Sequence, residues 1–356
     1  MQIDYSKLYR FELNLGYKCN FRCSYCFEPL SPIGFSNADV TSEQLHRFAD
    51  YMKYVAERLG SGVFHSICVY GGEPFLYFDR LVPFLLELKG TIHIFSLTTN
   101  GSMIKARLPE LLQLQQALGG GLHINVSYDF THQDKTRQAG TYQSVRDSVL
   151  LLDAHGFHVT CNTVLDRYTL PRIDETVRDF FALRQQCSNL VTKCQLARNR
   201  GDLDGVDVLQ VRRALSRVAS YFAQRPELRR SFFINPSLTY RGATLPYALT
   251  NNILLAMTPG GELYPGYDLP YMSDVARRYT LIGNIADDFD QIERNRLAMV
   301  EKLHLETPER CRTCDALCRF LPWMRMGDDI AEWGALPEQI YCDMYRLLTK
   351  YISYRP

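Results

Sequence analysis

Residues 16–29 read GYKCNFRCSYCFEP, and three cysteines in this stretch, Cys19, Cys23 and Cys26, are the most informative feature of the chain. Eleven cysteines placed at random over 356 positions would give this spacing about 0.01 times per chain, so the spacing is not accidental. The three cysteines lie too close together, and are odd in number, for a disulfide framework. We therefore interpret the three thiols as ligands of a metal centre.

Two kinds of metal centre suit such a set of thiols. Thiolate ligands favour zinc or an iron–sulfur cluster. A structural zinc site is closed and needs a fourth ligand. A cubane cluster that is held by three thiolates leaves one iron with an open coordination position, where chemistry could happen.

The next motif, Tyr70-Gly71-Gly72-Glu73-Pro74, ends a predicted strand and begins 44 residues after Cys26. Its two glycines let a ligand approach the backbone closely. Together the two motifs resemble those of the radical S-adenosylmethionine (SAM) superfamily. The resemblance implies that the three cysteines hold a [4Fe-4S] cluster whose fourth iron is chelated by SAM. It also implies that Gly71, Gly72, Glu73 and Pro74 bind the methionine part of SAM, and that Tyr25 is the aromatic residue typical before the last cysteine.

The same resemblance implies an activity. In that superfamily the reduced cluster splits SAM into methionine and a 5′-deoxyadenosyl radical, which takes a hydrogen atom from the substrate. The cofactor supplies this chemistry, and the protein supplies position and electrostatics. We therefore expect an enzyme that depends on an electron donor of the flavodoxin or ferredoxin type.

The composition argues against two classes of partner. Lys and Arg number 40 against 39 Asp and Glu, a net charge of +1, so the chain lacks the basic footprint of a nucleic-acid-binding protein. No run reaches the roughly 18 apolar residues of a membrane span, and the first residues do not form a secretory leader. We expect a cytoplasmic protein that binds neither nucleic acid nor membranes.

Apolar runs rich in β-branched residues alternate with segments of helical periodicity in the first part of the chain, which is typical of βα units around a parallel sheet. Strands are predicted at residues 11–15, 63–70, 91–99, 122–128, 158–165 and 190–197. Helices are predicted between them at residues 42–59, 75–88, 106–118, 142–154 and 174–186. The fold class is therefore α/β, with a partial (β/α)6 TIM-type barrel over residues 1–205.

Polar residues follow the third and fourth predicted strands, at the edge where such barrels carry their functional residues. They include Asn100, Ser127 and Asp129, and Arg137 comes shortly afterwards. This part resembles the superfamily branch that carries a SPASM extension and modifies peptides and proteins. The resemblance places all four residues at the SAM site, with Ser127 and Arg137 on the SAM carboxylate, a task that suits a bidentate arginine. As alternatives, Asn100 and Asp129 cap helices and Arg137 forms a surface ion pair.

A helical linker is expected at residues 206–250, and the composition shifts in residues 251–356, which we interpret as a second domain. Pro259, Gly260 and Gly261 predict a hairpin turn between two short apolar strands. Four cysteines follow that could ligate one metal centre completely, namely Cys311, Cys314, Cys318 and Cys342.

This second domain resembles a reduced SPASM or Twitch extension. The stretch PGGELYP at 259–265 and the segment Gly283-Asn284-Ile285 carry the resemblance. Gly266 stands where that extension has a hairpin cysteine, so the cluster that uses this cysteine is expected to be missing. The resemblance implies one auxiliary iron–sulfur cluster, a [4Fe-4S] cluster, on the four C-terminal cysteines. A structural zinc at the same residues is the alternative.

Other residues near the hairpin, and further cysteines, have weaker signals. Asp268 is the only acid in its turn and is a candidate proton acceptor. Four tyrosines around it either pack the hairpin or line a substrate groove, namely Tyr247, Tyr264, Tyr267 and Tyr271. We interpret the thiols within or beside predicted core elements as buried and inert, namely Cys68, Cys161, Cys187 and Cys194.

We therefore predict a radical SAM enzyme that modifies a peptide or protein substrate, as a maturase of a ribosomally made peptide does. Hydrogen abstraction leaves a carbon radical, and a crosslink or an unsaturation then requires the removal of one electron, which an auxiliary cluster could take. A separate partner that binds a leader peptide would fit this function. Two alternatives stay open: a radical SAM dehydrogenase or dehydratase of a small molecule, and a non-catalytic metal-binding subunit.

Overall fold

The computed structural model describes residues 8–26, 28, 39–197, 202–234, 254–267, 269–272, 274–306, 343–344, 346–348 and 350–351. Several residues of the sequence analysis lie outside these ranges, namely Asp268, Cys311, Cys314, Cys318 and Cys342. Residues 235–253, which include most of the second half of the expected linker, lie outside them as well. What we expect of these residues stays a prediction.

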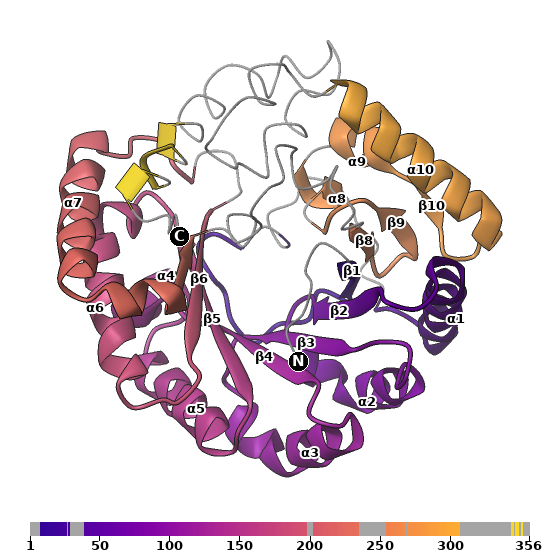
Figure 1. The fold of residues 1–356 in the computed structure, drawn as a ribbon, viewed down its shortest axis with the longest axis horizontal. Helices are drawn as coiled ribbons and strands as arrows, with labels where there is room; N and C mark the ends of the chain where they lie inside the picture. Colours follow the sequence, from indigo (N-terminus) through magenta and orange to yellow (C-terminus); the bar gives the residue numbers. More distant parts are fainter. Residues whose placement is uncertain are drawn as a thin grey trace.

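Six parallel strands form the centre of the fold, and each pairs with the next one along the chain. They are β1 (Leu8–Asn14), β2 (Phe64–Tyr70), β3 (Ile94–Thr99), β4 (Leu122–Ser127), β5 (His158–Leu165) and β6 (Val191–Leu196). Figure 1 shows that the strands curve and that the helices lie on their outer side. The α/β class and the six strands of the partial barrel are confirmed, with strand ends that differ from the predicted ones by three residues at most.

Helices follow the strands in the order expected for βα units. They are α1 (Ser42–Leu59), η2 (Pro74–Tyr77) with α2 (Phe78–Glu87), α3 (Ile104–Ala117), α5 (Tyr142–Ala154) and α6 (Ile173–Arg184). Short helical segments come after β4 and β5, namely η3 (Phe130–His132), α4 (Gln133–Thr136) and η4 (Leu170–Arg172). These short segments begin where the strands end, so they border the site described below.

The first helix, α1, begins at a reciprocal cap that its sequence encodes. Thr41 Oγ1 accepts a hydrogen bond from Gln44 N (3.1 Å), and Gln44 Oε1 accepts one from Thr41 N (2.8 Å). On the inner face of the helix, Phe48 is fully buried and meets Phe11 of β1 edge to face, with ring centroids 6.0 Å apart. Burial of aromatic rings in this geometry holds the helix against the sheet.

Further strands extend the sheet at both ends, to ten strands in the described part of the chain. Beyond β6 lies β7 (Phe232–Ile234), which is parallel to β6 and follows α7 (Val208–Gln224) and η5 (Pro226–Ser231). Beyond β1 lies β8 (Leu254–Met257), which is parallel to β1, followed by the antiparallel strands β9 (Glu262–Tyr264) and β10 (Gly283–Asn284). The later helices are α8 (Leu269–Met272), α9 (Asp274–Thr280) and α10 (Phe289–Glu306).

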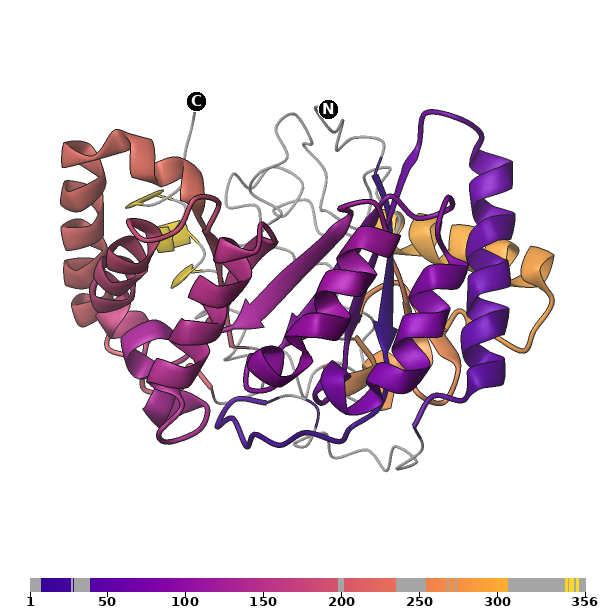
Figure 2. The ribbon, with the colours of Figure 1, turned by 90° about the horizontal axis from the view of Figure 1, so that it is seen from below.

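The predicted hairpin at residues 259–261 is confirmed by the antiparallel pair of β8 and β9. Because β8 pairs with β1, this hairpin continues the sheet of the barrel. Helix α10 then lies beside α1 (Figures 1 and 2). Arg47 Nε of α1 donates to Ile285 O (2.7 Å), and the rings of Tyr51 and Phe289 are 5.4 Å apart. The hairpin region is therefore packed against the first βα unit.

Alternate residues of the barrel strands face two different environments. Phe11 and Leu13 of β1 are fully buried on the helix side of the sheet. Arg10 and Glu12 of the same strand face a cavity inside the barrel, as does Lys193 of β6. The barrel therefore has an apolar outer layer and a polar interior.

Because of one residue of the apolar layer, His65 of β2, we expect the fold to lose stability in acid. Its ring lies beside Tyr9, Phe11 and His93. Burial, together with the neighbouring His93, lowers the pKa of His65 to about 4. A histidine in an unfolded chain has a pKa of about 6.5, so the unfolded state takes up the proton first. Above about pH 6.5, His65 is neutral in both states and does not lower the free energy of unfolding. As the pH falls from about 6.5 toward about 4, only the unfolded state is protonated, so the free energy of unfolding decreases.

We expect His65→Gln to reduce the loss of stability in acid by on the order of 2 kcal/mol, because the variant has no imidazole to protonate. The measurement is the free energy of unfolding in urea at about pH 7.5 and about pH 4.5. His46→Gln is the control, because His46 lies exposed on α1. If both variants show the same difference between the two pH values, His65 does not cause the acid sensitivity.

Candidate functional site

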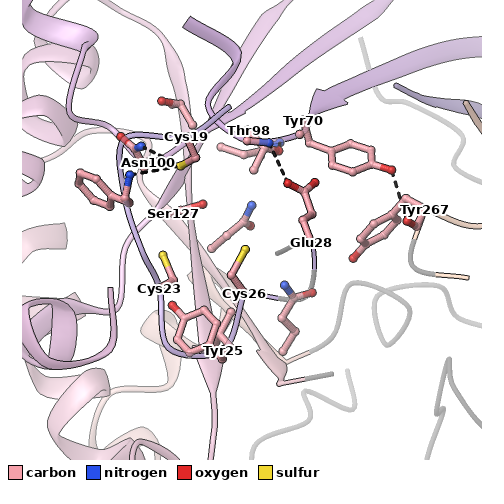
Figure 3. A pocket seen from close by; sticks show the side chains of 18 of the residues that line it. Cys19, Cys23, Tyr25, Cys26, Glu28, Tyr70, Thr98, Asn100, Ser127 and Tyr267 are labelled. Atoms are coloured by element: carbon pink, nitrogen blue, oxygen red, sulfur yellow. Dashed lines mark hydrogen bonds between the residues drawn. The ribbon is translucent and has the colours of Figure 1, made fainter. Parts of the chain in front are cut away.

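A cavity lies at the carboxyl ends of the six barrel strands and extends into the barrel. It brings the cysteine-containing loop together with residues that follow β2, β3 and β4 (Figure 3). Of the predicted site residues, those that line it are Cys19, Cys23, Tyr25, Cys26, Gly71, Gly72, Asn100, Ser127 and Arg137. The described residues Glu73, Pro74 and Asp129 are buried behind its wall.

The cysteine loop, residues 16–26, is tied to the barrel on two sides. Glu73 N donates to Lys18 O (2.8 Å), which links the loop to the end of β2. Ser24 N donates to Thr136 O (2.9 Å), which links it to α4. With its backbone held in this way, the loop presents its three thiols, the cysteine triad, to the cavity (Figure 3).

The cysteine triad suits an iron–sulfur cluster. Burial raises the pKa of Cys19 and Cys23, and it raises the pKa of Cys26 to about 12, so the thiols need a nearby positive charge to ionise. In the described ranges, no three cysteine, histidine or acidic side chains are placed to hold a single metal ion. The ligands of a cubane bind separate irons and need not converge on one point. The donor set, three thiols of one loop that line one cavity, therefore fits a cluster held by three thiolates.

Gly71 and Gly72 form the turn after β2, and a side chain fits at neither position. A Cβ on Gly71 would lie 1.9 Å from Asn14 Oδ1, and a Cβ on Gly72 would lie 2.0 Å from Lys18 O. Both residues also have positive φ angles, +101° and +48°. That these glycines let a ligand approach stays a prediction. In the structure they make room for Asn14 of β1 and for the backbone of the cysteine loop.

Glu73 stabilises the wall of the cavity through hydrogen bonds to the end of β3. Its carboxylate accepts hydrogen bonds from Thr99 Oγ1 (2.7 Å) and Asn100 N (2.8 Å) at the end of β3. Burial raises the pKa of Glu73 to about 7. Asn100, which Glu73 positions, donates from Nδ2 to Asn20 Oδ1 (2.7 Å) in the cysteine loop. Glu73 therefore supports the loop indirectly, and Asn100 is the member of this pair that reaches the cavity.

Asp129 and Arg137 form a buried ion pair beside the cysteine triad. Arg137 Nη2 donates to Asp129 Oδ1 (3.1 Å), and Arg137 Nε lies 3.1 Å from Asp129 Oδ2. Their side chains are 6% and 0% exposed, so the alternative of a surface ion pair is wrong. Arg137 Nη2 also donates to Asn162 O (3.1 Å), and the guanidinium lies 5.3 Å from the ring centroid of Tyr25. These contacts fix a cationic group at the wall of the cavity.

Glu28 is a cavity residue that the sequence analysis missed. Its carboxylate accepts hydrogen bonds from Gly72 N (2.8 Å) and Asn14 Nδ2 (3.1 Å). Burial raises its pKa to about 7. In the sequence, its position two residues after Cys26 indicates that Glu28 lies near the cysteine triad.

The polar interior of the barrel was also missed. Arg10, Glu12, Asn125, Lys193 and Gln195 line the deeper part of the cavity. The sequence indicates this interior through an alternation within the strands. Charged residues at every second position of an otherwise buried strand lie on the same face of the sheet. Among the described helices, none is long and apolar enough to cross a membrane.

The comparisons with known sequences agree with this site. Residues 13–180 match the family model described as the Radical SAM superfamily. The chain is 31% identical over 162 residues to a GTP 3′,8-cyclase of Staphylococcus saprophyticus, and 30% identical over 151 residues to that of Geobacter sulfurreducens. These matches cover 44% and 41% of this chain, and 45% and 42% of those proteins. The chain thus spans less than half the length of these curated relatives.

Solved structures share the fold over most of the chain. The structure described as native anSMEcpe with bound AdoMet and Cp18Cys peptide has a TM-score of 0.69 at 17% identity, and covers 97% of this chain and 96% of that one. Streptococcus suis SuiB bound to the precursor peptide SuiA has a TM-score of 0.61 at 15% identity, and covers 88% and 72%. At these identities the similarity establishes the fold.

We expect Gly72→Ala to displace the cysteine loop and to lower both stability and iron uptake, because the new methyl group would meet Lys18 O. Gly140→Ala is the matched control, since Gly140 also has a positive φ of +77° but no atom lies within 4 Å of its Cβ position. The control should lose about 1 kcal/mol from backbone strain alone. Urea unfolding and the iron bound after anaerobic reconstitution measure the difference, and equal losses in the two variants would argue against the contact.

Proposed function

We propose that this chain, whose residues 13–180 match the family model of the Radical SAM superfamily, is an enzyme that modifies a peptide or protein by hydrogen abstraction followed by crosslinking or oxidation. One observation carries the proposal. The cysteine triad, the turn of two glycines and a buried arginine all line one cavity at the ends of the barrel strands.

The residues of this cavity have distinct tasks in the proposal. The cysteine triad would hold a [4Fe-4S] cluster and leave one iron open. Arg137 and Ser127 would bind the carboxylate of SAM, and Gly71 and Gly72 would border its methionine part. When bound, the cluster and SAM supply a 5′-deoxyadenosyl radical that takes a hydrogen atom from the substrate. An electron donor of the flavodoxin or ferredoxin type would deliver the electron for this step.

Asp129 prepares Arg137 for its proposed task. The carboxylate holds the guanidinium at the cavity wall, so less side-chain freedom is lost when the SAM carboxylate binds. Because Asp129 itself does not line the cavity, we assign it a positioning role. The same reasoning makes Glu73 the positioning residue for Asn100.

One observation and one prediction from the sequence support a peptide substrate. The solved structures with the same fold, anSMEcpe and SuiB, include complexes with peptides. The cysteines at 311, 314, 318 and 342 would hold an auxiliary [4Fe-4S] cluster, which would accept the electron that a crosslink or an unsaturation has to lose. Asp268 stays our candidate for the proton acceptor.

A second candidate function is the modification of a small molecule. It is favoured by the sequence relatives, which are named GTP 3′,8-cyclase. The two candidates share the cavity and the radical chemistry and differ in the substrate.

We expect the anaerobically reconstituted protein to release 5′-deoxyadenosine when dithionite and SAM are added, as measured by chromatography. Cys23→Ala is the control, because it removes one ligand of the cluster. The parent should contain about eight irons per chain, four per cubane, and about four should remain when the whole triad is replaced by alanine. No nucleoside above the control, in protein with full iron loading, would contradict the radical SAM chemistry. About four irons and one zinc in the parent would contradict the auxiliary cluster alone.

Arg137→Lys tests the proposed grip on the SAM carboxylate. A lysine keeps the positive charge beside Asp129, but it lacks the several N–H groups with which a guanidinium can hold Asp129 and donate to a SAM carboxylate at the same time. We expect the affinity for SAM to fall roughly tenfold, on the order of 1.4 kcal/mol, while the bound iron stays at the parent level. Equilibrium dialysis of SAM and an iron assay on the same samples measure both quantities. Arg107→Lys on α3 is the control, and parent-like SAM binding by Arg137→Lys would remove Arg137 from the SAM site.

A further inference from the structure

Two cationic residues face the interior of the barrel from strands at opposite ends of the six-stranded set. Arg10 belongs to β1 and Lys193 to β6, and both line the cavity that contains the cysteine triad. Inside this cavity the charge of Arg10 contributes to a lowered pKa of Lys193. The two residues therefore belong to one site, although 182 residues of sequence separate them.

Lys193 differs from the other cations of the cavity in its surroundings. Arg10 Nη2 lies 3.0 Å from Glu12 Oε1, and Arg137 is paired with Asp129. The ammonium of Lys193 has neither an acidic partner nor a hydrogen-bond acceptor among the residues that the structure describes. Burial and the charge of Arg10 lower the pKa of Lys193 to about 8, which leaves it mainly charged at neutral pH.

The balance of charge in the described wall favours an anionic guest. The acidic residues that line the cavity are Glu12, which lies against Arg10, and Glu28, which is bound to Gly72 N at the cysteine loop. Neither compensates Lys193. Lys193 is half-buried in the cavity wall. A partly desolvated cation without a partner is costly, and an anionic oxygen that enters the cavity would reduce that cost.

We propose that Lys193, with Arg10 beside it, binds an anionic oxygen group of the substrate inside the barrel. The inference rests on the proposed function, because it takes this cavity as the substrate site, and it adds the class of substrate: a molecule with an acidic group on the part that enters the barrel. A carboxylate of a peptide or a phosphate of a nucleotide could supply this group, and Asn125 and Gln195 in the same wall offer neutral polar contacts beside it.

The first experiment measures nucleotide binding and tests whether the source of the anionic group is a phosphate. The full chain, reconstituted with its clusters and supplied with SAM, is dialysed against GTP and against guanosine. Lys193→Met and Lys105→Met are compared with the parent, and Lys105 serves as the matched control because it lies exposed on α3. If phosphate is the source, the parent binds GTP more tightly than guanosine. Lys193→Met then weakens GTP binding about 10- to 100-fold, and Lys105→Met leaves it unchanged.

The carboxylate source is tested by selection from a random peptide display library on the same three proteins. If carboxylate is the source, Asp or Glu is enriched at a fixed place in the peptides that the parent and Lys105→Met select, and this enrichment disappears with Lys193→Met. Lys193→Arg retains the charge and should restore it. Lys193→Gln replaces the Met variant if that variant does not fold.

The outcomes separate this inference from the proposed function. Binding that depends on the anionic group and on Lys193, in either arm, supports the inference and identifies the source. The inference is overturned if binding in neither experiment depends on the anionic group. It is also overturned if such a dependence is found but persists in Lys193→Met. Release of 5′-deoxyadenosine is measured on the same preparations. Its presence in the parent leaves the proposed function standing when the inference fails, and its absence counts against the proposed function itself.

Discussion

The carboxylate of Asp129 is the interaction on which the rest of the site depends. It accepts hydrogen bonds from Tyr25 in the cysteine loop, from Thr136 in α4 and from Val164 N at β5, and it pairs with Arg137. It thus joins three parts of the chain that are distant in sequence: the cysteine loop, residues 129–137 and β5. A buried carboxylate that lost its cation would cost several kcal/mol, so the pair cannot be taken apart without loosening the loop that carries the thiols.

The interior of this barrel departs from the usual pattern of parallel barrels, whose interiors are filled by layers of branched apolar side chains. Here Arg10, Glu12 and Lys193 occupy such inward positions and leave a cavity. Stability must then come from the other face of the sheet, where Phe11, Leu13 and the helices form the core. The polar side chains inside the barrel reduce its apolar packing, and therefore its stability, and they leave room for a ligand.

Much of this arrangement could be predicted from the sequence, and the limits have physical causes. Local periodicity was enough to predict the bounds of α1, residues 42–59, because it involves neighbours in the chain, and in the structure Thr41 caps the helix at that start. The cysteine and glycine motifs were enough to predict the superfamily whose model matches residues 13–180. Strands β7 and β10 were missed because two or three residues carry no periodicity. The sequence also could not show that Glu73 and Asp129 brace the wall from behind, since their partners come from other strands and loops.

The extra strands at both ends of the sheet have a consequence for solubility. A six-stranded parallel sheet would leave the backbone groups of β1 and β6 unpaired, and such edges can recruit strands of other molecules into aggregates. In the described part of the chain, β8 covers β1 and β7 covers β6. The outermost strands that result, β7 and β10, are only three and two residues long. Edges this short offer little template for intermolecular pairing, so an open barrel can keep its edges without assembling into fibres.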